Sequence, residues 1–180
     1  MGERTAPESI ALVQELVNTL DVETGRDALS TAEDLAAFAR RNGLAELGVG
    51  AADLPALRTL REALRAACRA HAGTEVPPAE RTALAGLLAG APLVLEVDAA
   101  GGAQLRPTAG LTGAAGLTAH IAAGIAEASA AGDWQRLKAC EAADCRWAFY
   151  DRSPAGRGRW CSMAVCGSRA KMRAYRARRG

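Results

Sequence analysis

The chain has 180 residues, of which 49% are hydrophobic, 23% charged and 4% aromatic. This length suits one domain, or a domain with an appendage, and the apolar fraction suits a packed core, which excludes a wholly disordered chain. No run approaches the roughly 20 apolar residues that cross a bilayer, and the first residues lack a secretory pattern. We therefore expect a cytoplasmic protein without membrane contact, whose thiols stay reduced.

Charge divides the chain near residue 133. Residues 1–133 carry 10 basic and 17 acidic side chains, a net charge of −7, whereas residues 134–180 carry 12 and 3, a net charge of +9. Six of the seven aromatic residues and four of the five cysteines also follow residue 133. We therefore expect an N-terminal domain over residues 1–132 and a smaller C-terminal module over residues 133–180.

The N-terminal domain is expected to consist mainly of helices. Apolar residues recur at intervals of three and four, and residues 30–33 fit a capping box in which Ser30 caps the next helix. The expected helices cover residues 7–20, 31–42, 54–68, 77–88 and 114–131. Residues 93–97 and 104–107 flank a glycine-containing turn and predict a β-hairpin. The fold class is therefore mainly α with a small β-hairpin (α+β).

Four cysteines of the C-terminal module form two close pairs. They are Cys140, Cys145, Cys161 and Cys166, with four residues inside each pair and fifteen between the pairs. Two short loops of this kind can direct four thiolates at one ion, so the pattern predicts a tetrahedral metal site with zinc as the cofactor. Iron in the same cage and a pair of disulfides are the alternatives. A closed all-thiolate site leaves no position for a reacting water, so we do not expect an enzyme.

The segment between the two cysteine pairs predicts a β-hairpin that links them. Residues 146–150 alternate in polarity, and residues 151–156 are rich in turn formers. The alternation places Trp147 and Phe149 on one face, which we expect to be buried as a small core, while Tyr150 points elsewhere. Aromatic side chains that stack on unpaired bases are the alternative.

A helix is expected after the third cysteine. Ser162 suits its N-cap, and the helix then reaches Arg178 with Cys166 in its first turns. Three alanines share the side of the helix that carries Cys166, and we expect this side to pack on the metal-binding loops. They are Ala170, Ala174 and Ala177. Loops, hairpin and helix together make a small treble-clef-like zinc module.

Basic side chains of this module form the candidate nucleic-acid surface. They are Arg152, Arg157 and Arg159 in the hairpin and Arg169, Lys171, Arg173, Arg176 and Arg178 in the helix. Like charges so close together repel one another, and phosphates would relieve this repulsion by accepting guanidinium hydrogen bonds. DNA is therefore the expected partner. RNA, an acidic protein partner and the acidic first domain of the same chain are the alternatives.

Four short motifs surround the cysteines. They are Leu137-Lys138-x-Cys140, Phe149-Tyr150-Asp151-Arg152-Ser153, Arg159-Trp160-Cys161-Ser162 and Cys166-Gly167-Ser168-Arg169-Ala170-Lys171. Together they resemble the CGNR zinc-finger family, and residues 16–21 and 35–44 are similar to the ABATE domain that precedes this finger. The resemblance implies a bacterial-type, stress-induced transcription regulator whose finger binds DNA. The asparagine that gives the finger its name is Ser168 here, so a contact of that amide is reduced to a hydroxyl contact or lost.

The first domain offers two polar candidates for an effector site. Asn18 and Thr19 interrupt an apolar helix end, and the ABATE resemblance draws attention to them as ligand-binding residues through which a regulator would receive its signal. Capping or ending the helix is the alternative. Cys68 and His71 have the spacing of a metal pair but lie near an apolar helical stripe, so burial in the core is the preferred interpretation. We find no phosphate loop, nucleophile elbow or zinc-protease motif.

Overall fold

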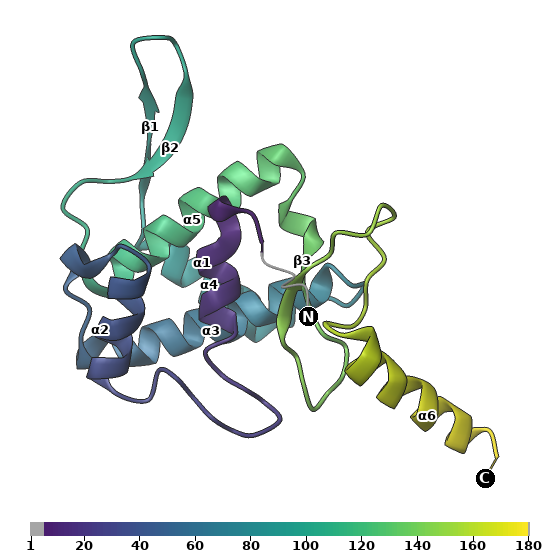
Figure 1. Cartoon of the computed structure of the whole chain (residues 1–180). Helices are drawn as coiled ribbons and strands as arrows, with labels where there is room; N and C mark the ends of the chain where they lie inside the picture. Colours follow the sequence, from purple (N-terminus) through teal and green to yellow (C-terminus); the bar gives the residue numbers. More distant parts are fainter. Residues whose placement is uncertain (1–5, 180) are drawn as a thin grey trace.

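The structure is a computed structural model and describes residues 6–179; residues 1–5, which open the expected first domain, lie outside the described part. The larger elements are α1 (Glu8–Val17), α2 (Ala32–Arg41), α3 (Leu54–Ala70), α4 (Pro78–Ala89), β1 (Leu93–Val97), β2 (Ala103–Pro107), α5 (Gly113–Ala131), β3 (Leu137–Ala139), β4 (Ala148–Tyr150), a π-turn (Met163–Gly167) and α6 (Ser168–Ala177). The expected fold class is confirmed, since helices dominate and the strands form small antiparallel pairs (Figure 1). Within residues 6–179, no helix is long and apolar enough to span a membrane.

The capping box of α2 lies one residue later than expected. Thr31, not Ser30, accepts the hydrogen bond from the Asp34 N–H at 3.1 Å, and the Asp34 carboxylate accepts the Thr31 N–H at 3.0 Å. Ser30 instead donates its hydroxyl to the Asp27 carbonyl oxygen at 2.6 Å. The reciprocal bonds of Thr31 and Asp34 satisfy backbone N–H groups at the start of the helix, which explains its defined start at Ala32.

The helix α3 is central to the hydrophobic core. Its side chains Leu57, Leu60 and Leu64 are fully buried, and α1, α4 and α5 pack against it. A side chain at Gly124 of α5 would collide with the Ser9 carbonyl oxygen of α1, so only glycine permits this close crossing. Burying each of these Leu side chains stabilises the fold by about 1.5–3 kcal/mol. The helix α3 is therefore a main source of hydrophobic stabilisation in the domain.

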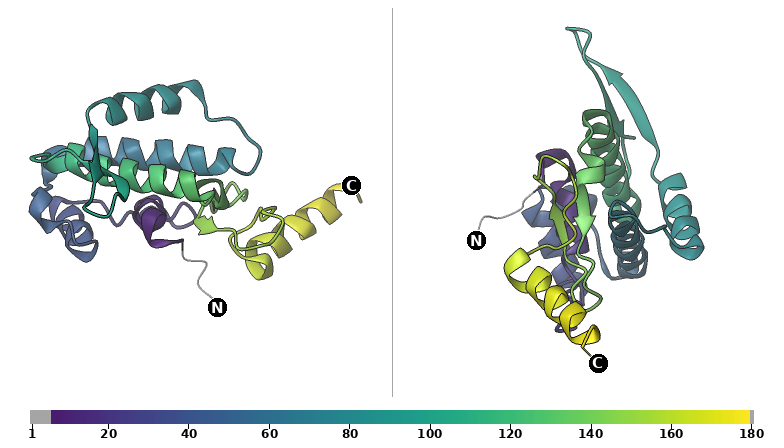
Figure 2. Two further views of the ribbon diagram at one scale, coloured as in Figure 1. Left: turned by 90° about the horizontal axis from the view of Figure 1, so that it is seen from above. Right: turned by 90° about the vertical axis from the view of Figure 1, so that its right-hand side faces the viewer.

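The β1–β2 hairpin projects from the helices as an arm (Figures 1 and 2). The expected hairpin is confirmed, with β1 antiparallel to β2 and Leu93 opposite Pro107. Asp98 holds the turn, because its carboxylate accepts the N–H groups of Ala100 and Gly102 at 2.8 Å each. The arm contacts α5, mainly through β2.

The β3–β4 hairpin belongs to the tail in sequence and to the main core in space. Its strands are antiparallel, with Lys138 opposite Phe149. Leu137, Ala139 and Ala148 are completely buried in the same cluster as α1 and α3. The expectation of a hairpin between the cysteine pairs is therefore wrong in its pairing. The strand at residues 148–150 pairs upstream, because the loop that carries the first two cysteines is itself the hairpin turn.

Candidate metal centre and basic surface

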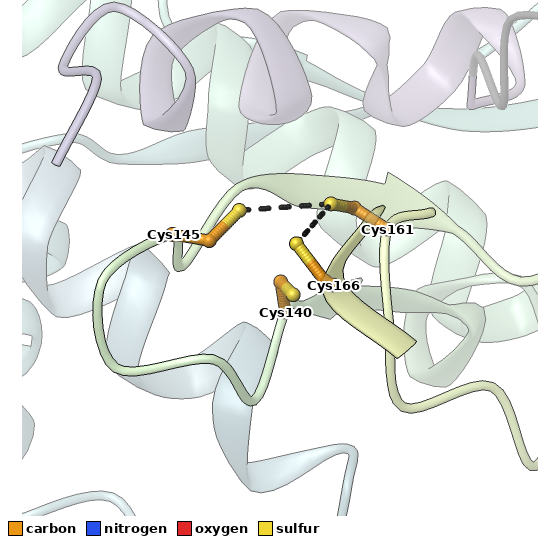
Figure 3. Close-up of side chains that lie close together, drawn as sticks. All are labelled: Cys140, Cys145, Cys161 and Cys166. Atoms are coloured by element: carbon orange, nitrogen blue, oxygen red, sulfur yellow. Dashed lines mark hydrogen bonds between the residues drawn. The ribbon is translucent and has the colours of Figure 1, made fainter. Parts of the chain in front are cut away.

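Four thiols converge next to the β3–β4 turn (Figure 3). Their Sγ atoms all lie within 4.8 Å of one another, and the separations are 3.6 Å for Cys145–Cys161 and 3.8 Å for Cys161–Cys166. A tetrahedral ion with metal–sulfur bonds of about 2.3 Å holds its sulfurs about 3.8 Å apart. A disulfide needs about 2.05 Å, and all four cysteines are free. The cluster therefore fits a metal ion and does not fit the disulfide alternative.

The first two ligands are held by the turn of the β3–β4 hairpin. The carbonyl oxygen of Ala142 accepts the N–H groups of Cys145 at 3.0 Å and Arg146 at 3.1 Å. Arg146 has a φ of 53°, a left-handed conformation that is uncommon for a residue with a side chain. The chain then enters β4. At the base of the loop, the Cys140 N–H donates to the Trp147 carbonyl oxygen at 2.9 Å. This tight loop brings both sulfurs to one side.

The second two ligands flank the start of the last helical segment. Ser162 caps this segment as expected, since its hydroxyl oxygen accepts the Val165 N–H at 3.3 Å. The segment opens with the π-turn before α6 begins at Ser168, whose hydroxyl donates to the Met163 carbonyl oxygen at 3.2 Å. A π-turn is wider than an α-turn and is frequent at functional sites. Here it holds Cys166 buried beside the other thiols.

Four thiols this close together can all ionise to thiolates only if a cation balances their charge. The hydrogen bond from Cys145 lowers the pKa of Cys140, whereas the hydrogen bond with Cys140 raises the pKa of Cys161. Burial raises the pKa of Cys166. Ionising one thiol thus makes its neighbours harder to ionise, and a divalent cation would favour thiolates at all four positions. The donor set suits a soft metal such as zinc or iron.

A buried ion pair fixes the loop between the two ligand pairs. Lys138 Nζ lies 3.1 Å from Asp151 Oδ2, with side chains only 4% and 2% exposed, and it also donates to the Gly156 carbonyl oxygen. The carboxylate of Asp151 accepts the N–H groups of Ser153 at 3.1 Å and Gly158 at 2.6 Å. Sequence reasoning missed this pair as a functional unit. The only available signal was that both residues stand in the motifs of the family resemblance.

Polar side chains of the helical domain attach this module to the body. Asn18 pairs with Ala148 as a neighbouring strand would, because its Nδ2 donates to the Ala148 carbonyl oxygen at 2.9 Å and its Oδ1 accepts the Ala148 N–H at 2.7 Å. The guanidinium of Arg65 is buried and donates to the carbonyl oxygens of Val17 at 2.8 Å and Arg146 at 3.0 Å. Neither contact could be predicted from local sequence patterns, since the partners are far apart along the chain.

Both residues expected to bind an effector lie at this junction. Asn18 is half-buried against β4, as described above. Thr19 is buried, donates its hydroxyl to the Leu16 carbonyl oxygen at 2.7 Å and accepts a hydrogen bond from Arg61 at 3.3 Å. The polar groups of both side chains are therefore engaged within the protein, and a ligand at this place would compete with those contacts.

Cys68 is buried in the core, as preferred from the sequence, whereas His71 is only half-buried at its edge. Cys68 is completely buried, and this burial raises the pKa of its thiol to about 12. His71 Nδ1 lies 2.7 Å from the Leu137 carbonyl oxygen, and its ring meets Trp134 edge-on with centroids 4.9 Å apart. These contacts join α3 to β3.

The eight basic residues expected to contact nucleic acid are all exposed. Three of them form ion pairs: Arg159 with Glu141, Arg169 with Glu23, and Arg173 with Asp144. The pair of Arg169 and Glu23 links α6 to the helical domain at 2.8 Å, with both side chains nearly half exposed. Exposed pairs of this kind are weak and exchange readily for other anions.

The helix α6 extends away from the rest of the molecule (Figures 1 and 2). Ala170 is half-buried, whereas Ala174 and Ala177 are exposed together with the other residues of α6. The expectation that this small-residue side packs on the metal-binding loops is therefore wrong. The π-turn supplies the buried contacts instead, through Cys166 and Gly167, and α6 continues outward from it.

The aromatic residues beside the metal centre also differ from expectation. Trp147 is 39% exposed, so the prediction that it shares a buried face with Phe149 is wrong. Trp147 precedes β4 and lies in the turn, whereas all three residues of β4 are buried. Tyr150 is buried with Phe149, and its hydroxyl donates to Asp133 Oδ1.

Two family models match the chain. ABATE, described as "Putative stress-induced transcription regulator", matches residues 11–132, and the CGNR zinc finger matches residues 136–179. Their order agrees with the resemblance drawn from the motifs, and all four clustered cysteines lie in the second match. A search of curated proteins found no match.

Proposed function

Because the chain belongs to the ABATE family and ends in a CGNR zinc finger, we propose that it is a transcription regulator that binds DNA through its C-terminal module. Cys140, Cys145, Cys161 and Cys166 hold a zinc ion in this proposal. The ion has a structural role, since four thiolates close the coordination sphere and leave no position for a reacting water. It joins the segment that carries α6 to the loop of the β3–β4 hairpin.

The observation that supports DNA binding best is the exposure and charge of α6. Its charged side chains are Arg169, Lys171, Arg173 and Arg176, with no acidic residue among them. The helix protrudes from the body, so a nucleic acid can approach it from several sides (Figure 2). Ten residues make a helix about 15 Å long, and the major groove of B-DNA, about 12 Å wide, admits such a helix.

The basic residues divide into two groups in this proposal. Those of α6 and Arg178 enter or line the groove, whereas Arg152, Arg157 and Arg159 of the loop contact the phosphate backbone. The buried pair of Lys138 and Asp151 positions that loop. A phosphate replaces Glu23 as the partner of Arg169, since this exposed pair is weak. Arg159 keeps its two hydrogen bonds to the partly buried Glu141 and adds positive charge to the surface that faces the phosphates.

We place the effector input of the regulator at Asn18 and Thr19. The contacts of Asn18 with Ala148 connect the helical domain to β4, and β4 lies next to the metal-binding loop. Thr19 adjoins this contact and donates to Leu16 at the end of α1. A ligand or partner that engages the Asn18 amide would loosen this connection and change how the finger is held. An effector would therefore alter DNA affinity in the full chain and lose that effect in Asn18→Ala.

DNA titrations of the full chain at two salt concentrations test the main proposal. Arg173→Ala should weaken binding and reduce the slope of log K against log [salt] by about one if this side chain meets a phosphate. Arg81→Ala, which removes an exposed arginine of α4 far along the chain from the finger, is the matched control and should change neither. A slope that Arg173→Ala leaves unchanged contradicts the role of Arg173.

Binding experiments on the full chain also distinguish DNA from the alternative partners, RNA and an acidic protein. Retention of RNA but not duplex DNA at equal salt would favour RNA binding. Capture of an acidic protein that persists after nuclease treatment, without retention of either nucleic acid, would favour an interaction module. Metal analysis of the purified chain separates zinc from iron, and one zinc per chain is the result expected.

A further inference from the structure

The exposed helix α6 carries two large apolar side chains among its basic ones. Met172 is 51% exposed and Tyr175 is 43% exposed. On a helix that extends into solvent, these side chains lack the stabilisation that burial would give them (Figure 1). Exposed apolar surface is typical of interaction sites, and the charges around the two residues indicate what binds here.

The geometry of the helix places Met172 between two basic flanks. Consecutive residues of an α-helix are about 100° apart around the axis, so Arg173 lies about 100° to one side of Met172 and Lys171 about 100° to the other. Tyr175 lies about 60° from Met172, on the Lys171 side. Met172 and Tyr175 therefore form a narrow apolar strip with a cation on each side of it.

The side of α6 opposite Met172 carries alanines and no charged residue. The alanines lie about 140–200° from Met172 around the axis, and they are Ala170, Ala174 and Ala177. Arg169 and Arg176, in contrast, lie within about 60° of Met172. A polyanion on the alanine side would leave both arginines pointing away from its phosphates. Electrostatic attraction therefore favours an approach from the Met172 side.

Two ion pairs show how α6 is turned relative to the rest of the protein. Arg169 Nη1 lies 2.8 Å from Glu23 Oε1, and Arg173 Nη1 lies 3.9 Å from Asp144 Oδ2. These contacts place the Arg173 flank toward the body, and the Lys171 flank faces solvent. The strip of Met172 and Tyr175 lies between the two flanks, where a nucleic acid can reach it.

We propose that Met172 and Tyr175 face the base edges when α6 enters the major groove, and that Met172 selects a thymine by contact with its C5-methyl group. This inference rests on the proposed function. A phosphate backbone borders the groove on each side, and Arg173 and Lys171 are placed to meet one backbone each. The thymine methyl is an apolar group that distinguishes this base in the major groove, and the flexible thioether of methionine can pack on it.

Tyr175 has a different part in this recognition. The guanidinium of Arg179 lies over its ring, with Cζ 4.8 Å from the centroid, and this cation–π contact restrains the ring beside Met172. A phenolic hydroxyl both donates and accepts hydrogen bonds, so it can pair with base edges of either kind. We therefore assign affinity without a base preference to Tyr175, and selectivity to Met172.

Enrichment of duplexes from a random-sequence pool by the full, zinc-loaded chain provides the DNA for the test. In the preferred duplex, each thymine is replaced in turn by uracil, which removes one methyl group and no hydrogen-bonding group. At one of these positions the replacement should weaken binding of the wild type about threefold to fivefold, the effect of losing a single buried methyl contact.

Two variants assign this effect to Met172. Met172→Ala should bind the thymine and uracil duplexes equally, because the methyl group has lost its partner. Its salt slope should equal that of the wild type, since no charge changes, which separates it from Arg173→Ala. Ala174→Met is the matched control, because it adds the same side chain on the opposite side of α6 and should keep the preference for thymine. Circular dichroism checks that both variants fold.

Three results would overturn this inference while DNA binding stands. They are a pool that yields no preferred sequence, a preferred duplex in which no uracil weakens binding, and a preference for thymine that Met172→Ala retains. Absence of binding to any duplex would overturn the proposed function together with the inference. Binding to vesicles of anionic phospholipid that depends on Met172, without enrichment of any duplex, would overturn both and assign this strip to a membrane surface.

Discussion

The β3–β4 hairpin and α6 lie in the same basic tail, yet they are held in different ways. The hairpin is buried on both faces, and the side chains of Leu137, Ala139 and Ala148 complete the core of the helical domain. The helix α6 has no buried residue and extends into solvent (Figure 1). Four thiols lie between these two segments, two on the hairpin loop, one just before the π-turn and one within it.

This difference shows that the boundary in composition is not the boundary in packing. Charge, aromatic content and the matched family models all change near residue 133. The packed core continues past that point to Tyr150 and ends inside the zinc module. We infer that the metal ion joins a segment stabilised by the core to a segment with little core of its own. Experiments on this protein therefore need the full chain.

Of the variants proposed here, one that removes the Asp151 carboxylate should lower the free energy of unfolding most. Asp151 directly follows β4 in the segment that the core stabilises. Asp151→Ala leaves the ammonium of Lys138 buried without its partner, and breaking a buried pair in this way costs about 3–5 kcal/mol. The free energy of unfolding from urea titration measures the loss. Asp144→Ala removes an exposed carboxylate from the neighbouring loop and should change this free energy by less than about 0.5 kcal/mol. Equal effects of the two variants would refute the difference in burial.

The environment of the Asp151 carboxylate predicts that the free energy of unfolding depends on pH. Burial alone would raise the pKa of Asp151, but hydrogen bonds from Ser153 and Gly158 outweigh it and hold the pKa below its ordinary value. A depressed pKa stabilises the folded state above the ordinary carboxyl pKa of about 3.9, and this stabilisation is lost as the pH falls through the lower folded value. The difference in unfolding free energy between wild type and Asp151→Asn should therefore be constant near neutral pH and shrink below about pH 4. A difference that grows in acid would contradict this sign.

Loss of the Asn18 amide should lower the free energy of unfolding by an intermediate amount. Asn18→Ala removes two hydrogen bonds to the backbone of Ala148, each worth about 0.5–1.5 kcal/mol, so we expect a loss of about 1–3 kcal/mol. Hydrogen exchange should become faster in β4 and stay unchanged in α6. Gln135→Ala removes an exposed amide two positions before β3 in the sequence and serves as the control. Faster exchange confined to α6 would mean that Asn18 does not secure the hairpin.

The smallest effect on stability is expected at the contact between α6 and the body. Glu23→Gln removes the partner of Arg169, but both side chains are nearly half exposed, so the unfolding midpoint should not change measurably. DNA affinity should rise slightly, because Arg169 no longer needs to exchange a carboxylate for a phosphate. Thermal unfolding and a DNA titration measure the two quantities. A clear fall in the unfolding midpoint would show that α6 is held by the body.

The features that could be predicted from the sequence are those that depend on local patterns of residues. Helical periodicity, a capping motif and alanine content predicted α1 to α5, and the spacing of four cysteines predicted the thiol cluster. The strand β3 has three residues and no periodicity of its own, so its pairing with β4 could not be deduced. The contact of Asn18 with Ala148 joins residues 130 positions apart, which no local pattern records. The direction of α6 depends on the π-turn, for which the sequence carries no recognised signal.

Hydrogen exchange of the full chain with and without a zinc chelator tests the central claim most directly. We predict that metal removal greatly accelerates exchange in residues 160–168, while β3, β4 and α3 keep their protection, because the helical core holds these elements without the ion. Loss of protection in β3 and β4 to the same extent as in residues 160–168 would contradict this account. Unchanged exchange in residues 160–168 after complete removal of the metal would contradict it equally.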